Sequence, residues 1–318
     1  MTGPPPATLG LDGERYLTDN EDRLSWIMGS SRSGSTWLLE MLTATEGVAG
    51  IDDPHLGHHL GVWRPLPLAW ATAEERPRLR TLSEVKRDKP GYFFSERYRD
   101  AWLPALQQLV RARFGAQLDD ELPAGAVAPR VVVKEPGSHA ADLLLSAFPR
   151  SRLIFLLRDG RDVVDSWLDA HQRGSWAIDE GAFPVADHGR LALVEWLSSV
   201  WTYRTEAVGR AYARHEPSKR CVIRYESLRR DPAAELERAF AAIDVDLDAD
   251  EVRAIAESNS YELVSPGSRG PRRRVRTASP GGWQRSLDRD ERRAMHAIMG
   301  TQLAAWGYLD AGESEQAA

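Results

Sequence analysis

Short apolar runs alternate with amphipathic helical stretches along this chain, and this alternation limits the possible folds more than any other feature. The runs that read as strands are Leu24–Met28, Val131–Val133, Leu153–Leu157 and Cys221–Tyr225. Helical spacing of apolar residues recurs over residues 139–147, 233–243 and 289–306. Continuous apolar strands separated by helices are typical of a parallel sheet that is buried on both faces. The sequence therefore predicts an α/β fold of three layers, with helices on both faces of the sheet.

Length and composition favour one globular domain between two polar ends. Hydrophobic residues make up 42% of the 318 residues and charged residues 28%, which suits a chain with a true core. We expect a flexible leader over residues 1–22, one domain over residues 23–309 and a polar tail over residues 310–318. No internal repeat or long linker argues for a further division.

Several classes of protein are excluded on the same evidence. The net charge of −6 argues against a nucleic-acid binder with a basic surface. No run approaches the roughly 18 apolar residues that a membrane helix needs, and the first 22 residues lack an export signal. We therefore expect a cytoplasmic protein that has no membrane or nucleic-acid partner. The single cysteine, Cys221, excludes an intramolecular disulfide and a metal site built from several thiolates.

Three of the four predicted strands end at conspicuous polar motifs, which are SSRSGST, KEPGSH and RDGRD. Ligands of open parallel sheets lie beyond the carboxyl ends of the strands, at the turns into the helices. We therefore expect a ligand site where these three motifs meet.

The first motif, residues 29–36 (GSSRSGST), has the features of an anion-binding loop. Its glycines allow a tight turn, and the following helix supplies N–H groups and partial positive charge. It approaches the nucleotide-binding pattern G-x-x-x-x-G-K-[ST], but Ser35 stands where that pattern has lysine, and the cation is Arg32. The loop is thus suited to a phosphate or similar oxyanion, whereas hydrolysis of a nucleoside triphosphate is disfavoured. A plain Gly/Ser-rich connecting turn is the other interpretation.

Longer segments around these motifs resemble the sulfotransferases that use 3′-phosphoadenosine 5′-phosphosulfate (PAPS), particularly their bacterial and Golgi-type branches. SSRSGSTWLLEML resembles the family's 5′-phosphosulfate loop, RLIFLLRDGRDVVDSWL its 3′-phosphate segment, and RYESLRRDPAAELERAFAAIDV the region after its fourth strand. The resemblance covers about residues 24–306 and is weak over residues 56–125. It implies a P-loop NTPase-like fold and transfer of a sulfuryl group from PAPS to a hydroxyl or amine of a small-molecule or carbohydrate acceptor. It implies no metal.

The resemblance also implies which residues bind the donor. Arg158 and Ser166 match the positions that hold the 3′-phosphate, and Tyr225 is a candidate contact for adenine or a residue that merely caps its strand. One of the arginines in residues 272–276, with Arg276 favoured, would fold over the 3′-phosphate. The residues expected around the 5′ side are Arg32, Ser33, Gly34, Ser35, Thr36 and Trp37.

Catalysis is expected from Lys134, Arg32 and Asp53. Lys134 would stabilise the leaving group, assisted by Arg32, because fixed cations suit a transition state with spread negative charge. Asp53, in the segment GIDDPH, stands where the resembling branch commonly has an acidic base, usually glutamate. Neutral imidazoles are rival bases near pH 7, and a metal site at the histidine cluster is a weaker alternative. The rival bases are His55, His58, His59 and His139, and the possible metal cluster is His55, His58 and His59.

Two other functions remain open from the sequence, namely a P-loop-type nucleotide kinase and a nucleotide-binding protein without catalysis. Binding of adenosine 3′,5′-bisphosphate (PAP) but not ATP would separate the sulfotransferase from the kinase. We expect residues 56–125 and 170–190 to build the acceptor pocket, and the sequence predicts no oligomeric state.

Overall fold

A computed structural model describes residues 12–59, 79–122, 129–179, 189–268, 270, 272–273 and 279–309. Its centre is a five-stranded sheet whose strands all pair in parallel, in the order β2-β3-β1-β4-β5. The strands are β1 (Leu24–Met28), β2 (Val48–Asp52), β3 (Arg130–Lys134), β4 (Arg152–Leu157) and β5 (Arg220–Arg224). The predicted α/β class is confirmed. The sequence analysis missed β2, and it placed Tyr225 in a strand although this residue begins a helix.

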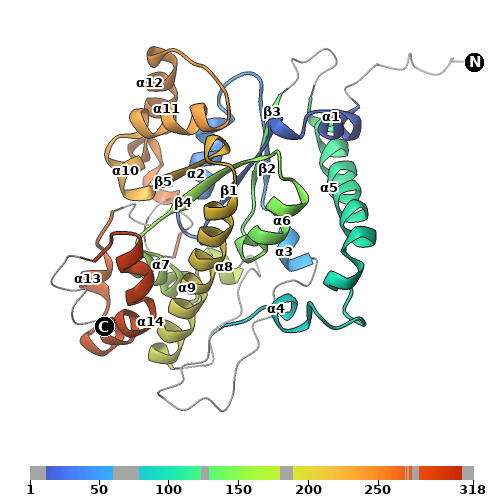
Figure 1. Ribbon diagram of the computed structural model, residues 1–318. Coiled ribbons are helices and arrows are strands. Elements are labelled where there is room, and N and C mark those ends of the chain that lie inside the picture. The colour runs from blue at the N-terminus through green and yellow to red at the C-terminus, as the bar shows by residue number, and fades with distance from the viewer. Residues whose placement is uncertain are drawn as a thin grey trace, which may run out of the picture.

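Helices follow each strand (Figure 1). Those of the first half are α1 (Gly13–Asp19), α2 (Ser35–Leu42), α3 (Leu56–His59), α4 (Leu82–Lys86), α5 (Arg99–Glu121), α6 (Ala141–Ala147) and α7 (Gly160–Ala170). Those of the second half are α8 (Trp176–Asp179), α9 (Arg190–Arg214), α10 (Tyr225–Arg230), α11 (Pro232–Ala242), α12 (Ala249–Ser258), α13 (Trp283–Ser286) and α14 (Arg289–Ala305). The helix predicted over residues 139–147 begins as a 3₁₀ turn, Ser138–Ala140, and continues as α6.

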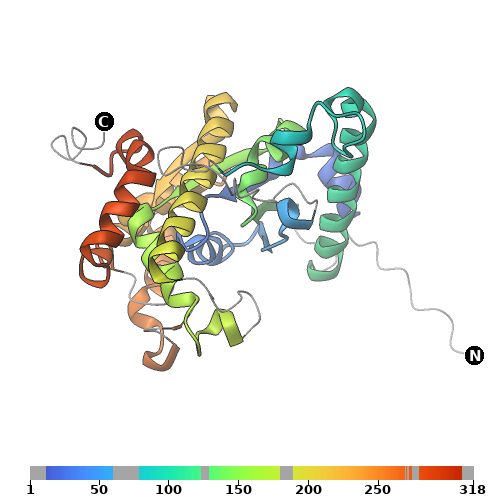
Figure 2. The same cartoon turned by 90° about the horizontal axis from the view of Figure 1, so that it is seen from below.

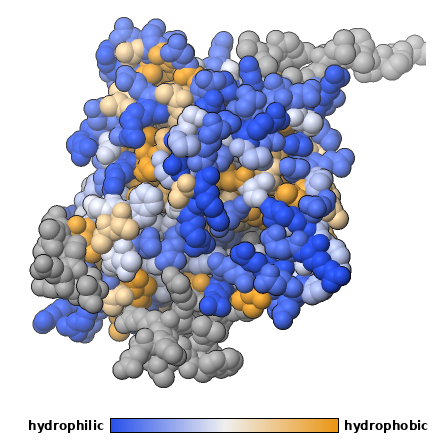
Figure 3. Space-filling model, in the orientation of Figure 1, coloured by the Kyte–Doolittle hydropathy of each residue, from blue (hydrophilic) through white to orange (hydrophobic). Residues whose placement is uncertain are grey.

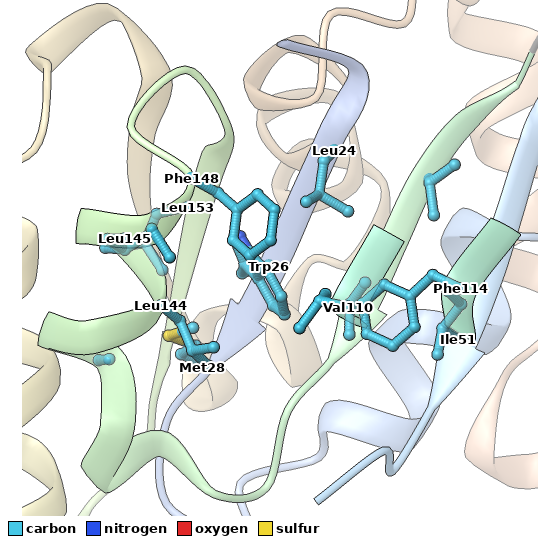
Figure 4. Close-up of a cluster of buried hydrophobic side chains, with 14 of the residues drawn as sticks. Leu24, Trp26, Met28, Ile51, Val110, Phe114, Leu144, Leu145, Phe148 and Leu153 are labelled. Atoms are coloured by element: carbon cyan, nitrogen blue, oxygen red, sulfur yellow. The ribbon is translucent and has the colours of Figure 1, made fainter. Parts of the chain in front are cut away.

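Helices cover both faces of the sheet, as three layers require. Alternate residues of a strand point to opposite faces, so Trp26 and Met28 pack against α5 and α6 while Ile27 packs against α2 and α11. In Figure 4 the Trp26 ring lies between Phe148 and Phe114, with ring centroids 5.8 and 6.2 Å away. A third cluster joins α7, α9 and α14 beside the sheet. The packing of these three clusters holds the strands in place, and with them the polar motifs at the strand ends.

The leader predicted over residues 1–22 is wrong for its second half. Residues 13–19 form α1, whose Tyr16 and Leu17 are buried against α5. Asp12 caps the helix by accepting a hydrogen bond from the backbone N–H of Arg15, and the Tyr16 hydroxyl donates to the carbonyl of Pro129. The adjacent side chains of Tyr16 and Leu17 thus join this segment to the domain. Residues 1–11 and 310–318 lie outside the described residues.

The surface seen in Figure 3 is mostly hydrophilic, with hydrophobic residues in small groups. Across the parts of the chain that the structure describes, no helix has the length and apolar character needed to cross a membrane.

Strand register brings three polar motifs to one edge of the sheet. Lys134, at the end of β3, stands opposite Ile27 of β1 on one side and Asp52 of β2 on the other. On the far side of β1, Met28 pairs with Phe155 of β4. In Figure 1, α3, which follows β2, lies below the sheet, and Figure 2 shows the molecule from below.

Candidate active site

The turn between β1 and α2 wraps tightly at the carboxyl end of the central strand. Arg32 and Gly34 both have left-handed backbone, with φ of 71° and 86°. This geometry reverses the chain within a few residues, so that α2 begins at Ser35 with its amino terminus at the loop. Unpaired N–H groups at such a terminus favour an oxyanion.

Arg32 and Arg158 meet instead of pointing to opposite surfaces. The Arg158 guanidinium donates a hydrogen bond of 2.7 Å to the carbonyl of Arg32, and the Arg32 Nε donates to the Ser166 hydroxyl at 3.1 Å. All three residues line one cavity of about 440 Å³, together with Gly34, Ser35, Thr36 and Trp37. The cations that the sequence assigned to two anion sites therefore share a single cleft.

Tyr225 lies against both parts of this cleft. Its ring stacks on the Arg158 guanidinium, 4.3 Å from the charge to the ring centroid, and its edge touches the backbone at Gly34. A Cβ atom at Gly34 would lie 2.7 Å from the tyrosine ring. The ring is nearly buried and still contributes to the cavity wall. Tyr225 thus positions Arg158 as well as facing the ligand space.

The far wall of this first cavity comes from a segment that the sequence analysis missed. The turn after α12 contributes Asn259, Tyr261 and Leu263. It is held by the Trp37 indole, whose N–H donates to the carbonyl of Asn259 at 2.7 Å. Arg229 lies between the rings of Trp37 and Tyr261, at 5.8 and 5.3 Å. Nothing in the local sequence marks this turn as part of a site, because it joins the cleft through packing on α2 and α10.

A second cavity, of about 510 Å³, lies on the other side of the same loop. It shares Arg32, Ser35 and Thr36 with the first cavity and adds Asp53 and Lys134. The Lys134 ammonium donates to the Thr36 hydroxyl at 2.7 Å. It also pairs with the carboxylates of Asp52 and Asp53, at 2.6 and 3.0 Å. Lys134 is thus fixed at the point where the two cavities meet.

Sequence comparison adds the family to this geometry. Residues 26–249 match the sequence profile described as the sulfotransferase family. The chain belongs to the sulfotransferase family. This assignment favours neither the kinase nor the non-catalytic nucleotide-binding protein, and it identifies the enzyme as a sulfotransferase. No sequence among curated proteins matches the chain closely enough to count as a relative.

Solved structures share the fold of this sulfotransferase at low sequence identity. The mouse sulfotransferase SULT7A1, crystallised with PAP, is 12% identical with a TM-score of 0.55, covering 93% of this chain and 91% of the mouse chain. The sulfotransferase STF9 from Mycobacterium avium is 14% identical with a TM-score of 0.51, covering 93% of this chain and 81% of that chain. These likenesses support the P-loop-like sulfotransferase fold expected from the sequence.

The four histidines of the sulfotransferase divide between two places. His55 and His58 line the second cavity, whereas His139 lies behind His58, with ring centroids 5.0 Å apart, and His59 lines neither cavity. Burial lowers the pKa of His55, lowers that of His58 to about 4, and lowers that of His139 further. These three imidazoles are therefore neutral at pH 7. In the described part of the chain, no group of His, Cys, Asp or Glu side chains is arranged to hold a metal ion.

Three aspartates of α7 hold the basic segment that follows residue 264. Asp169 accepts from the backbone N–H of Arg272 at 2.6 Å, and Asp162 accepts from that of Gly281 at 2.7 Å. Asp165 accepts from the Ser286 hydroxyl at 2.5 Å. Helix α7 thus contacts this segment at Arg272, Gly281 and Ser286. Arg276, favoured by the sequence for the 3′-phosphate, lies outside the described residues.

Proposed function

We propose that this sulfotransferase moves a sulfuryl group from PAPS to a hydroxyl, or an amine, of a small-molecule or carbohydrate acceptor. The observation that carries the proposal is the pair of cavities on either side of the loop of residues 29–36. A transfer between two substrates needs both to reach one anion-binding turn from opposite sides. Arg32 and Thr36 line both cavities and so border the path of the transferred group.

The first cavity suits the donor because PAPS carries anions on both sides of its ribose. The 5′ side would lie on the N–H groups and hydroxyls of Gly34, Ser35 and Thr36, while Ser33 of the same loop lines the second cavity. The 3′-phosphate would bind Arg158 and Ser166, with an arginine of residues 272–276, such as Arg276, as a further contact. Planar guanidinium groups favour bidentate binding of such oxyanions. The structure of the mouse enzyme with PAP supports a donor of this kind.

Aromatic side chains of the first cavity offer a surface for the adenine. Trp37, Tyr225 and Tyr261 come from three elements and line the same space. Flat aromatic faces stack on a base with little dependence on its hydrogen-bonding pattern, so selectivity over other nucleotides falls to the phosphate contacts. Choice of the 3′-phosphorylated donor over ATP would therefore depend mainly on Arg158.

Lys134 and Asp53 would perform the chemistry in the second cavity. The acceptor oxygen attacks sulfur, the bond between sulfur and the bridging oxygen breaks, and PAP leaves. Lys134 and Arg32 neutralise the charge that develops on the leaving group, in place of the Mg²⁺ that kinases use. Asp53 takes the proton from the acceptor hydroxyl, since its carboxylate faces the same cavity at 3.0 Å from the Lys134 ammonium.

The acceptor would occupy the second cavity between the histidines and two tryptophans. Trp167 and Trp176 line it together with His55 and His58, which are neutral at pH 7. Aromatic walls and neutral imidazoles fit an uncharged hydroxyl compound, such as a phenol or a sugar, because its apolar face packs on the rings. His55 and His58 are then neighbours of the acceptor, and Asp53 is the base that we favour.

Calorimetric titration and a product assay test the proposal. Wild-type enzyme should bind PAP, should bind ATP and 5′-AMP far more weakly, and should add one sulfuryl group to an acceptor found by mass spectrometry with isotopically labelled PAPS. Arg158→Ala should lower PAP affinity about 10²-fold with little change for 5′-AMP, since a lost charge-assisted contact is worth up to about 3 kcal/mol. Equal affinities of the wild-type enzyme for PAP and 5′-AMP would refute the assignment of the 3′-phosphate site.

A further inference from the structure

Glu135, the residue after Lys134, is a buried carboxylate with no part in the chemistry proposed above. Its side chain is 1% exposed. One oxygen accepts the backbone N–H of Gly137 at 2.5 Å, and the other accepts that of Leu56 at 3.0 Å. Leu56 follows Asp53 by three residues, and Gly137 belongs to the turn that leaves β3. The carboxylate thus joins the segment that carries the proposed base to the strand end that carries Lys134.

The same cluster reaches the anion-binding loop on the central strand. The backbone N–H of Glu135 donates to the carbonyl of Ile27 at 3.1 Å. Ser138 donates to the carbonyl of Glu135 and accepts from the N–H of Gly29, both at 2.9 Å. The loops that follow β1, β2 and β3 are therefore linked through the side chain and backbone of Glu135 and the hydroxyl of Ser138.

A buried cation from a distant helix balances this carboxylate. Arg204 of α9 is buried, donates to the Ser31 hydroxyl at 3.1 Å and stacks on Trp167 at 5.3 Å. Burial lowers the pKa of Arg204 to about 10, and the negative charge of Glu135 opposes this shift. Burial likewise raises the pKa of Glu135 to about 7, against the N–H donors that lower it. A buried titratable side chain whose pKa is strongly shifted by its surroundings is typical of functional sites.

We propose that Glu135, supported by Arg204, is a positioning residue for sulfuryl transfer, which holds the Lys134 ammonium and the Asp53 carboxylate at a fixed separation. This inference rests on the proposed function. A carboxylate is required because both of its partners are N–H donors, whereas a glutamine amide would turn its NH₂ group toward one of them. Reacting groups must be held to within about 0.5 Å for efficient transfer, so the loss of one contact should slow chemistry without emptying either cavity.

The test is Glu135→Gln, with Glu21→Gln as the matched control. Glu21 is also a buried carboxylate whose two oxygens both accept hydrogen bonds, from the N–H of Arg150 at 2.8 Å and from the guanidinium of Arg111 at 2.9 Å. It lies just before β1, at the opposite edge of the sheet. In Glu135→Gln, kcat should fall about 10²-fold, while KM for the acceptor and Kd for PAP change less than about threefold. Glu21→Gln should keep kcat near the wild-type value.

Retention of wild-type kcat by folded Glu135→Gln overturns the inference, and so does an equal loss of kcat in both variants. Wild-type enzyme that does not bind PAP would instead overturn the proposed function. If Glu135→Gln does not fold, Arg204→Lys tests the same cluster from the side of α9, because lysine keeps the charge near Glu135 but lacks the planar fork that donates to Ser31 and stacks on Trp167. It should lower kcat about tenfold with PAP affinity retained, and unchanged kcat would again overturn the inference.

Discussion

The contact between Gly34 and Tyr225 makes a sharp test of how the anion-binding loop is built. Gly34 has φ of 86°, and a Cβ atom there would lie 2.7 and 2.9 Å from two atoms of the Tyr225 ring. Gly34→Ala therefore combines two penalties. The left-handed backbone costs roughly 1–2 kcal/mol for a residue with a Cβ. The overlap with a nearly buried ring adds about 1–3 kcal/mol.

Gly47 provides the matched control. It has φ of 77°, yet a Cβ atom at this position would meet nothing within 4 Å, and it precedes β2 at the other edge of the sheet. Gly47→Ala should lose only the roughly 1–2 kcal/mol of the backbone term. The difference between the two variants in free energy of unfolding, measured by urea denaturation, isolates the contact with Tyr225.

The same substitution should weaken PAP binding, because Tyr225 supports Arg158 at 4.3 Å. A ring that moves away from the new methyl group displaces the guanidinium from the 3′-phosphate. We expect Gly34→Ala to lower PAP affinity about tenfold or more, a loss of about 1.4 kcal/mol, by calorimetry. Gly47→Ala should bind PAP as the wild type does. Equal losses of stability in the two variants, or unchanged PAP affinity in Gly34→Ala, would refute this reasoning.

Three further changes test the second cavity. Asp53→Asn should reduce turnover about 10²–10⁴-fold with PAP binding retained, because it removes the proposed base. The control is Asp52→Asn, which also removes a carboxylate beside Lys134. Because Asp52 does not line the cavity, this variant should keep most turnover in the product assay. Lys134→Ala should lower kcat about 10²–10³-fold, since a preorganised cation is lost, with a much smaller change in calorimetric PAP affinity. The pKa of Glu135, raised from 4.5 to about 7 by burial, means that the folded state takes up a proton as pH falls from 7 to 4.5. Over that range the wild type should gain about 3 kcal/mol in free energy of unfolding relative to Glu135→Gln, measured by urea denaturation at a series of pH values.

Each of these outcomes can fail separately. Equal turnover in the two aspartate variants would remove Asp53 from the mechanism. Loss of PAP binding in Lys134→Ala would make the lysine a donor ligand rather than a stabiliser of the leaving group. If wild type and Glu135→Gln differ by the same free energy of unfolding at pH 7 and at pH 4.5, the pKa of Glu135 is not raised in the folded state.

The sequence predicted those parts of the fold that have a strong local signal. Four strands are continuous apolar runs, but β2 contains Ala49 and Gly50, which have low β-propensity, and so it was not recognised. The 23-residue helix α5 contains Pro104, and α9 carries a buried arginine within its apolar face, so neither helix has a simple periodic pattern. The helix α1 was missed because its apolar contacts come from Tyr16 and Leu17, two adjacent residues that make no periodic pattern.

The same limit applies to the candidate site. Lys134 and Arg158 stand at strand ends, and Arg32 lies in the turn that follows β1. Ligand contacts of a parallel sheet gather there, so the meeting of these residues could be expected from the sequence. Glu135 gave a weaker signal, because its partners Leu56 and Arg204 come from segments whose packing no motif reports. Tyr261 was missed for a similar reason. Residues of this kind are recognised as part of a site only from the structure, which shows the contacts between elements that are distant in the sequence.

Helix α7 has a consequence for changing the acceptor. Its residue Ser166 lines the first cavity, proposed for the donor, and its neighbour Trp167 lines the second cavity, proposed for the acceptor. Its aspartates bind the basic segment at Arg272 and Gly281. A substitution on this helix that shifts its backbone would disturb nucleotide binding and acceptor fit together. Engineering that aims at new acceptors should therefore leave α7 intact and begin at His55, His58 and Trp176, which line the second of these two cavities and not the first.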